Sequence, residues 1–159
     1  MLKQIGLAAA IMTAGTAFSL TQTIAEDSAR SGVVKVRSAY SVPETVKRIK
    51  QDVAAKGITL FATIDQARLA ADAGITLRPS TLIVFGNPPL GAQFLTSNPD
   101  AGLDWPVRVL VREDADGKVW AVYSDFTWIA RRFGIEDRRP QFEKASSVIG
   151  SITASVAAH

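Results

Sequence analysis

Two runs of alternating side chains flank the short polar segment Asp114–Gly117, and this pattern restricts the fold more than any other feature of the sequence. Alternation with a period of two is typical of a β-strand that buries one face. A type I turn with Gly117 in the left-handed bulge position would join the two strands and pair Asp114 with Lys118. In this register one face carries Val107, Val109, Val111, Val119, Ala121 and Tyr123, and the other carries Arg108, Leu110, Arg112, Trp120, Val122 and Ser124. We therefore predict a hairpin with Val109 and Val111 buried and with Arg108, Arg112 and Trp120 on the opposite face.

The rest of the chain alternates strand and helix patterns. Strands are predicted over 32–37, 58–64 and 81–85, and the last is an uninterrupted apolar run, which is typical of a central strand covered on both faces. Helices are predicted over 42–56, 65–73, 91–97, 125–133 and 142–156. The first of these helices begins with a capping box in which the Ser41 side chain accepts from first-turn amides while Glu44 reaches back. Asp65 and Asp125 are expected to be N-caps of their helices.

The first 25 residues have the layout of a secretory signal peptide: Lys3, an apolar run over 5–20, and small residues before Glu26. Cleavage there leaves 134 of the 159 residues and lowers the formal net charge from +3 to +2. An uncleaved anchor is the alternative, although the run is short for a membrane span. We expect a disordered lead-in over 26–32, a single domain over 33–159, and a periplasmic or secreted location in a bacterium.

Composition excludes several classes of function. The chain has no cysteine and a single histidine at position 159, which removes thiolate metal sites, disulfides and most histidine chemistry. Interspersed charges give no basic footprint for nucleic acid. There is no P-loop and no serine-hydrolase elbow, and the carboxylates around Asp114 are explained by a turn and a helix cap. We expect no cofactor, no metal, and no membrane contact after cleavage.

Four separated motifs occur together in order: LFATID at 60–65, LRPST at 77–81, FGNPPLG at 85–91 and EDADGKVW at 113–120. Together they make residues 33–134 resemble the domain-of-unknown-function 302 family. The resemblance implies an α+β fold, a curved mainly antiparallel sheet with helices packed on one face, in a single domain. Many relatives have histidine after the aspartate that matches Asp65, whereas this chain has Gln66. The family has no established activity, so the resemblance implies no catalytic residues.

Two groups of residues are candidates for ligand binding. The first is the loop after strand 81–85, with Gly86, Asn87, Leu90 and Gly91, where backbone amides could converge on an anion or a carbonyl and Phe85 and Leu90 could line an apolar pocket. The second is Arg108, Arg112 and Trp120, where two guanidinium groups could hold an oxyanion in a sheet-lined groove. The alternatives are an ordinary strand-to-helix turn and a solvated sheet face.

From these residues we expect a non-catalytic domain that binds a small ligand or a protein partner. The alternative is an enzyme acting on a small oxyanion or an organic acid through Arg108, Arg112 and Asn87. The C-terminal helix has no charged residue from Ala145 to Ala158 and shows serines on its outer face. We expect this helix to be covered by the sheet, or to meet a second copy in a homodimer.

Overall fold

The computed structural model describes residues 31–158, so the predicted signal peptide and most of the lead-in lie outside the described residues. The elements in chain order are β1 (Val33–Arg37), α2 (Val42–Ala55), β2 (Thr59–Asp65), α3 (Gln66–Asp72), β3 (Ser80–Gly86), α4 (Pro88–Ser97), the 3₁₀ helix η1 (Pro99–Leu103), β4 (Val107–Glu113), β5 (Val119–Ser124), α5 (Phe126–Arg132) and α6 (Arg139–Ala154).

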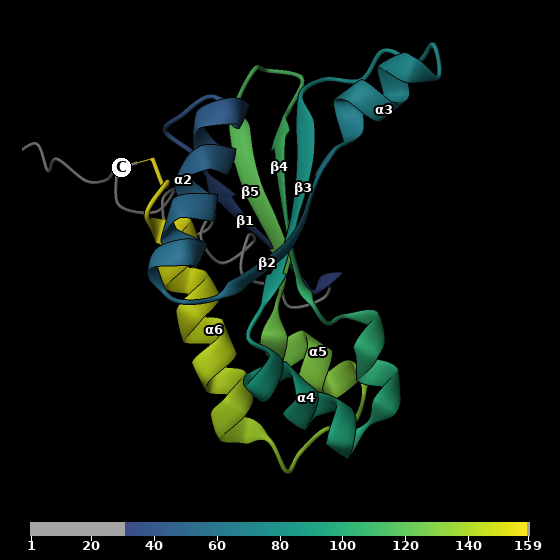
Figure 1. Ribbon diagram of the computed structural model, residues 1–159, viewed down its shortest axis with the longest axis vertical. Helices are drawn as coiled ribbons and strands as arrows, with labels where there is room; N and C mark the ends of the chain where they lie inside the picture. Colours follow the sequence, from purple (N-terminus) through teal and green to yellow (C-terminus); the bar gives the residue numbers. More distant parts are fainter. Residues whose placement is uncertain (1–30, 159) are drawn as a thin grey trace, which may run out of the picture. The chain divides into compact units, whose positions relative to one another are not determined.

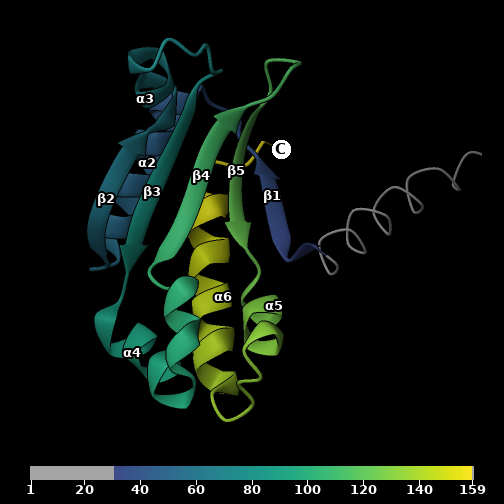
Figure 2. The ribbon, with the colours of Figure 1, turned by 90° about the vertical axis from the view of Figure 1, so that its right-hand side faces the viewer.

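The five strands form one sheet in the order β1-β5-β4-β3-β2, and every neighbouring pair is antiparallel. Helices α2 and α6 lie side by side on one face of this sheet, and α4 and α5 lie at one end of it (Figures 1 and 2). Among the described residues, no helix covers the length of the other face (Figure 2). This arrangement confirms the α+β fold with an antiparallel sheet and helices on one face.

The core lies between the helix-bearing face of the sheet and helices α2 and α6. It is built from the buried side chains of Ile83, Phe85, Val109, Val111, Val119 and Ala121 in the strands, and of Ile49, Val53, Phe142, Ile149 and Ile152 in the helices. Each of these valine, isoleucine and phenylalanine side chains contributes roughly 1.5–3 kcal/mol relative to an exposed position. Ile149 and Ile152 of α6 are buried in this core, whereas Phe142 stacks on Phe94 of α4 with ring centroids 4.2 Å apart.

The hairpin β4–β5 has the predicted register, with Arg112 opposite Trp120 and Leu110 opposite Val122. Val109 and Val111 are buried and Gly117 has the left-handed backbone conformation (φ 75°). Asp114 holds the turn because its carboxylate accepts from the amides of Asp116 and Lys118. It also accepts from Nε1 of Trp120 at 2.7 Å, a bond that the sequence pattern did not suggest. This indole hydrogen bond lowers the pKa of the Asp114 carboxyl below its ordinary value.

Two cap predictions are confirmed and one is wrong. The Asp65 and Asp125 side chains accept from the amides three residues later, as N-caps do. Ser41 is the N-cap residue of α2, but its side chain makes no cap hydrogen bond. Glu44 instead pairs with Arg48 at 2.8 Å along the same helix, so the carboxylate that would close the capping box is engaged by a guanidinium group.

The prediction for strand 81–85 is also corrected. The central strand of the sheet is β4, and β3 lies between β4 and β2. Ile83 and Phe85 are buried beneath the helices, but Leu82 and Val84 point to the face without helices and are only half-buried. An uninterrupted apolar run therefore does not require cover on both sides, because neighbouring long side chains shield the outer residues in part.

Candidate ligand cavity

A cavity of about 480 Å³ opens where the end of β3 meets α4 and α6. Its volume is in the range of small-molecule sites. The buried aromatic side chains of Phe85, Phe94 and Phe126 lie in its wall, together with the half-buried Trp105. The polar lining residues are Lys56, Asn87, Lys144, Ser147 and Ser151. The cavity is thus mainly apolar, with a few polar groups that could orient a ligand.

The loop Gly86–Gly91 forms one wall of this cavity, and its glycines make room for the indole of Trp105. A Cβ atom added at Gly91 would lie 1.8 Å from Nε1 of that indole, and one at Gly86 would lie 3.4 Å from the same atom. No side chain fits at Gly91 unless the indole moves. Gly91 is therefore explained by close packing of an aromatic ring against a helix.

Asn87 caps helix α4, which begins three residues earlier than predicted. Its side-chain oxygen accepts from the amide of Leu90 at 3.1 Å, and its carbonyl oxygen accepts from Gly91 at 2.9 Å. Pro88 and Pro89 have no N–H to offer. The backbone from Pro88 to Gly91 therefore offers no free amide to an anion, because the first turn of α4 uses the Leu90 and Gly91 donors.

Among the described residues, the only charged ones that line the cavity are Lys56 and Lys144. Lys56 forms an ion pair with Asp52 at 3.0 Å. Lys144 is exposed on α6 and makes no ion pair with any described residue. No carboxylate from residues 31–158 lines the cavity. A ligand in it would meet apolar walls and positive charge at the rim.

The second group of predicted residues lies elsewhere. Arg108, Arg112 and Trp120 do not line the cavity, because they point to the face of the sheet opposite Val109 and Val111. The structure therefore does not bring the two arginines together with Asn87, as the groove of the enzyme alternative requires. Arg108 and Arg112 are four residues apart on one strand, about 13 Å, which is too far to hold one small oxyanion jointly.

The Arg108 guanidinium already has hydrogen-bond partners within the protein. It donates to the Leu103 carbonyl at 2.8 Å and to the Asp104 carboxylate at 2.9 Å. Arg132 of α5 donates to the other oxygen of the same carboxylate at 2.7 Å. The Asp104 side chain is only 6% exposed, so this triad joins the start of β4 to α5. The Arg112 guanidinium makes no ion pair or side-chain hydrogen bond with any described residue. Its cross-strand neighbour Trp120 donates a hydrogen bond to the Asp114 carboxylate.

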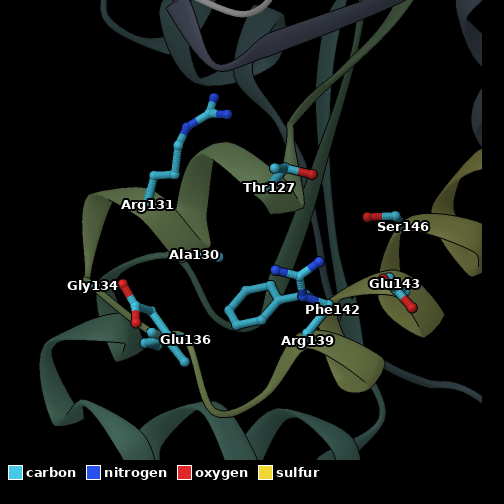
Figure 3. Close-up of a pocket in the computed structure, with 10 residues that line it drawn as sticks. Thr127, Ala130, Arg131, Gly134, Glu136, Arg139, Phe142, Glu143 and Ser146 are labelled. Carbon is cyan, nitrogen blue, oxygen red and sulfur yellow. The ribbon is translucent and has the colours of Figure 1, made fainter.

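A wider hollow of about 990 Å³ lies between α5 and α6 (Figure 3). Charged side chains of both signs line it, namely Arg131, Glu136, Arg139 and Glu143, and all four are exposed. In Figure 3 Arg139 lies beside the ring of Phe142, whereas Arg131 points away from it. We favour the smaller cavity as the site because three buried aromatic rings line it, whereas Phe142 is the only aromatic residue that lines the hollow.

Sequence reasoning located five lining residues of the cavity, Phe85, Gly86, Asn87, Leu90 and Gly91, and missed the rest. Phe94 lies further along α4, whereas Trp105, Phe126 and Lys144 come from three other segments, and no local motif connects them. One signal was present: a glycine inside a helical pattern has a packing reason more often than not, and here that reason is Trp105. Among the described residues, no group of three or more His, Asp or Glu side chains is placed to hold a metal ion.

The fold and the cavity define a small α+β domain with an open antiparallel sheet and a potential small-molecule site. The chain belongs to the DUF302 family of domains of unknown function, whose model matches residues 34–156. The structure resembles an uncharacterized conserved DUF302 protein from Bacillus stearothermophilus, with a TM-score of 0.71 and 14% identity over 78% of this chain and 97% of that one. At this identity the likeness concerns the fold alone.

Two curated relatives are named Fluoride-specific ion channel FluC 1, from Brucella suis biovar 1 and Brucella abortus biovar 1. Each is 39% identical to this chain over 105 residues, which are 66% of this chain and 41% or 39% of the relative. The chain thus spans about two fifths of the length of these relatives. Within residues 31–158, no helix is long and apolar enough to cross a membrane.

Proposed function

We propose that this protein is a non-catalytic binding domain for a small molecule with an apolar body and an acidic group, held in the cavity between β3, α4 and α6. The observation that carries this proposal is the lining by described residues, which consists of aromatic and aliphatic side chains with two lysines as the only charged groups. Apolar walls would exclude water from the ligand body, and a rim lysine would select a carboxylate.

Binding is favoured over catalysis because of what lines the cavity. A general acid–base reaction needs a group that exchanges protons near neutral pH, most often histidine or a carboxylate with a raised pKa. Within residues 31–158, neither type of side chain lines this cavity. The two lysines lie at its rim, and Lys56 is already paired with Asp52. The groups present can orient a ligand but offer no proton relay.

The first experiment measures ligand binding with a matched pair of variants. We expect decanoate to raise the melting temperature of the protein and to bind with a measurable heat. Ser147→Trp would fill the cavity from α6 and abolish both effects. Ala154→Trp is the control, because Ala154 is exposed two turns further along the same helix and lines none of the cavities described here. Equal binding by the two variants would exclude the cavity.

The second experiment tests the acidic group. Decanoate should bind more tightly than decanol, which has the same apolar chain without the charge. Lys144→Gln should reduce this preference by about tenfold, the scale of 1.4 kcal/mol for a charged hydrogen bond. Lys47→Gln is the control, because Lys47 is an exposed lysine of α2 that does not line the cavity. Equal affinity for acid and alcohol in the unmodified protein would leave an apolar site but reject the charge selectivity.

We infer a second candidate role from the relatives, which is attachment to an ion-channel system at a membrane. It is supported by the length of the match, because a region like this chain makes up about two fifths of two proteins named as fluoride-specific ion channels. Deletion of the gene should then raise the sensitivity of the host to fluoride. Unchanged growth over a range of fluoride concentrations would reject this role and would not affect the ligand proposal.

Export remains a proposal based on residues 1–25. A charged head, an apolar run and small residues before Glu26 support cleavage by a signal peptidase. The intact mass of the protein isolated from its host should correspond to a chain that starts at Glu26. A mass that retains residues 1–25 would reject cleavage.

A further inference from the structure

One region of the molecule has a cluster of large apolar side chains that are exposed to solvent. Residues 59–79, here called the arm, comprise β2, α3 and the segment that leads into β3. Among the described residues seven large hydrophobic side chains are exposed, and six of them belong to the arm: Leu60, Phe61, Ile64, Leu69, Ile75 and Leu77. Helix α3 contributes no buried residue, and Figure 1 shows it at the far end of β2 and β3, away from α4 and α5.

The arm also contains a free sheet edge. β2 is the last strand in the order of the sheet and pairs only with β3 among the described residues. Six of its seven residues are exposed, and none from Thr59 to Ile64 is charged or proline. Natural edge strands are normally guarded by lysine, by proline or by a bulge. β2 has only a bulge, between Leu60 and Ala62.

We propose that the arm is a homodimer interface, in which the β2 strands of two copies pair antiparallel about a two-fold axis. The six apolar side chains of each copy would then be covered by the arm of the other. A two-fold interface requires a surface that is complementary to itself. An edge strand meets this requirement, because its unpaired amides and carbonyls match those of an identical strand that runs in the opposite direction.

Charge and area favour a second copy over other occupants. The arm carries two acidic and two basic residues, Asp65, Asp72, Arg68 and Arg78, so two arms do not repel each other and offer nothing to a strongly charged partner. The exposed fractions of the six apolar residues correspond to on the order of 600 Å² per copy, close to the roughly 800 Å² per partner of a standard interface once polar neighbours are included. Isolated monomers rarely leave so large an apolar patch uncovered.

The first test measures the mass of the full chain in solution at high micromolar concentration. We expect twice the mass of one chain, and a return to the single mass in the double variant Leu69→Glu/Ile75→Glu. Both side chains are more than half exposed, at 59% and 61%, so the fold tolerates the charges. The control is Leu103→Glu, which should stay dimeric, because Leu103 is the one described large hydrophobic residue outside the arm that is exposed, at 66%.

The second test locates the interface directly, using the absence of cysteine in the chain. Ala62 is the middle residue of β2. Ala62→Cys should form an intermolecular disulfide on mild oxidation, because the Cα atoms of facing residues in an antiparallel pair are about 4.5–5.5 Å apart. Leu103 is more exposed than Ala62, and Leu103→Cys should nevertheless not cross-link.

Three outcomes would overturn the proposal: a monomer at these concentrations, a dimer that survives the double variant, or cross-linking through Ser151→Cys on α6 in place of Ala62→Cys. The last outcome would assign the interface to the C-terminal helix. The unmodified protein could also be a monomer that binds anionic lipid vesicles, with binding abolished by Leu69→Glu/Ile75→Glu. That result would show that the arm binds lipid and would equally reject the dimer.

Discussion

Three connections join strands that are consecutive in the chain and adjacent in the sheet, and two of them differ clearly in how they are stabilised. β4 and β5 are joined by the tight turn at Asp114–Gly117, whereas β2 and β3 are joined by residues 66–79, which include α3. The strands of the first connection bury Val109, Val111, Val119 and Ala121, whereas α3 buries nothing. Most helical stability in proteins comes from tertiary packing. Helix α3 is therefore stabilised by the Asp65 cap and by the strands β2 and β3 on either side of it, or by a partner that covers it.

The largest expected difference is between core and arm substitutions. Ile83 is fully buried on β3, and Ile83→Ala should lower the free energy of unfolding by about 3–4 kcal/mol, the usual scale for a large-to-small change in a packed core. Leu69→Ala on α3 removes a side chain that is 59% exposed and should change it by less than about 0.5 kcal/mol. Denaturant titration of the monomeric protein measures both.

The dependence of the unfolding free energy on protein concentration separates the two regions further. If the arm dimerises, Leu69→Ala should become destabilising as the concentration rises, because the lost contact lies in the interface. Ile83→Ala should show the same loss at every concentration. A large loss for Leu69→Ala in the monomer would contradict the contrast between the two regions.

Two helical glycines give the next largest effect. Gly91→Ala in α4 places a methyl group against Trp105 and should destabilise the protein by about 1–3 kcal/mol, the scale of overpacking. Gly150→Ala in α6 meets no atom within 4 Å and should stabilise it by up to about 1 kcal/mol, because alanine is the better helix former. Thermal or chemical denaturation of the two variants gives effects of opposite sign if the packing is as described. Equal effects would show that the indole moves aside.

Local rules predicted the secondary structure and the hairpin register. Alternation around Asp114, the Asp65 and Asp125 caps and the spacing of apolar residues in α6 each depend on a few neighbouring residues, so the sequence carries that information. Ser41 shows the limit of such rules, because Glu44 had a second partner, Arg48, four residues further along the helix. The start of α4 was misplaced because Pro88 and Pro89 suggested a loop, although proline is accepted in the first turn of a helix.

The candidate site was predicted only in part, for a different reason. The Gly86–Gly91 loop was identified because its composition is unusual, but its role depends on Trp105, which no pattern placed beside it. The arginines were placed on the correct face of the hairpin, yet that face points away from the cavity. The same holds for the arm, since each exposed leucine or isoleucine looks like a core residue until the fold shows that no helix covers it.

A smaller effect is expected where the arm is attached to the sheet. The Ser80 hydroxyl on β3 donates to the side-chain oxygen of Gln66, the first residue of α3, at 2.8 Å. Ser80→Ala should lower the free energy of unfolding by only about 0.5–1 kcal/mol, the net value of one hydrogen bond. It should nevertheless speed amide exchange in α3, which has no buried residue to hold it.

The control for this variant is Thr96→Ala, which removes a hydroxyl that bonds within α4, from Thr96 to the Gln93 carbonyl at 2.8 Å. Amide exchange in α3 should not change in the control. Unaltered α3 exchange in Ser80→Ala would show that the Asp65 cap alone anchors the arm.

The smallest effect is a pH dependence located at the tight turn. Hydrogen bonding from Trp120 lowers the pKa of Asp114 below its ordinary 3.8 in the folded protein. A carboxyl with a depressed folded pKa adds stability above its unfolded pKa, near 3.9, and loses it as the pH falls through the folded value. The folded protein should therefore lose this contribution below about pH 4, and Asp114→Asn, which cannot ionise, should lack that part of the slope. Carboxyl NMR should give a midpoint for Asp114 below 3.8, and the Trp120 indole proton should shift with the same midpoint. A midpoint at or above 3.8, or an indole signal indifferent to pH, would show that the bond from Trp120 does not hold the turn in solution.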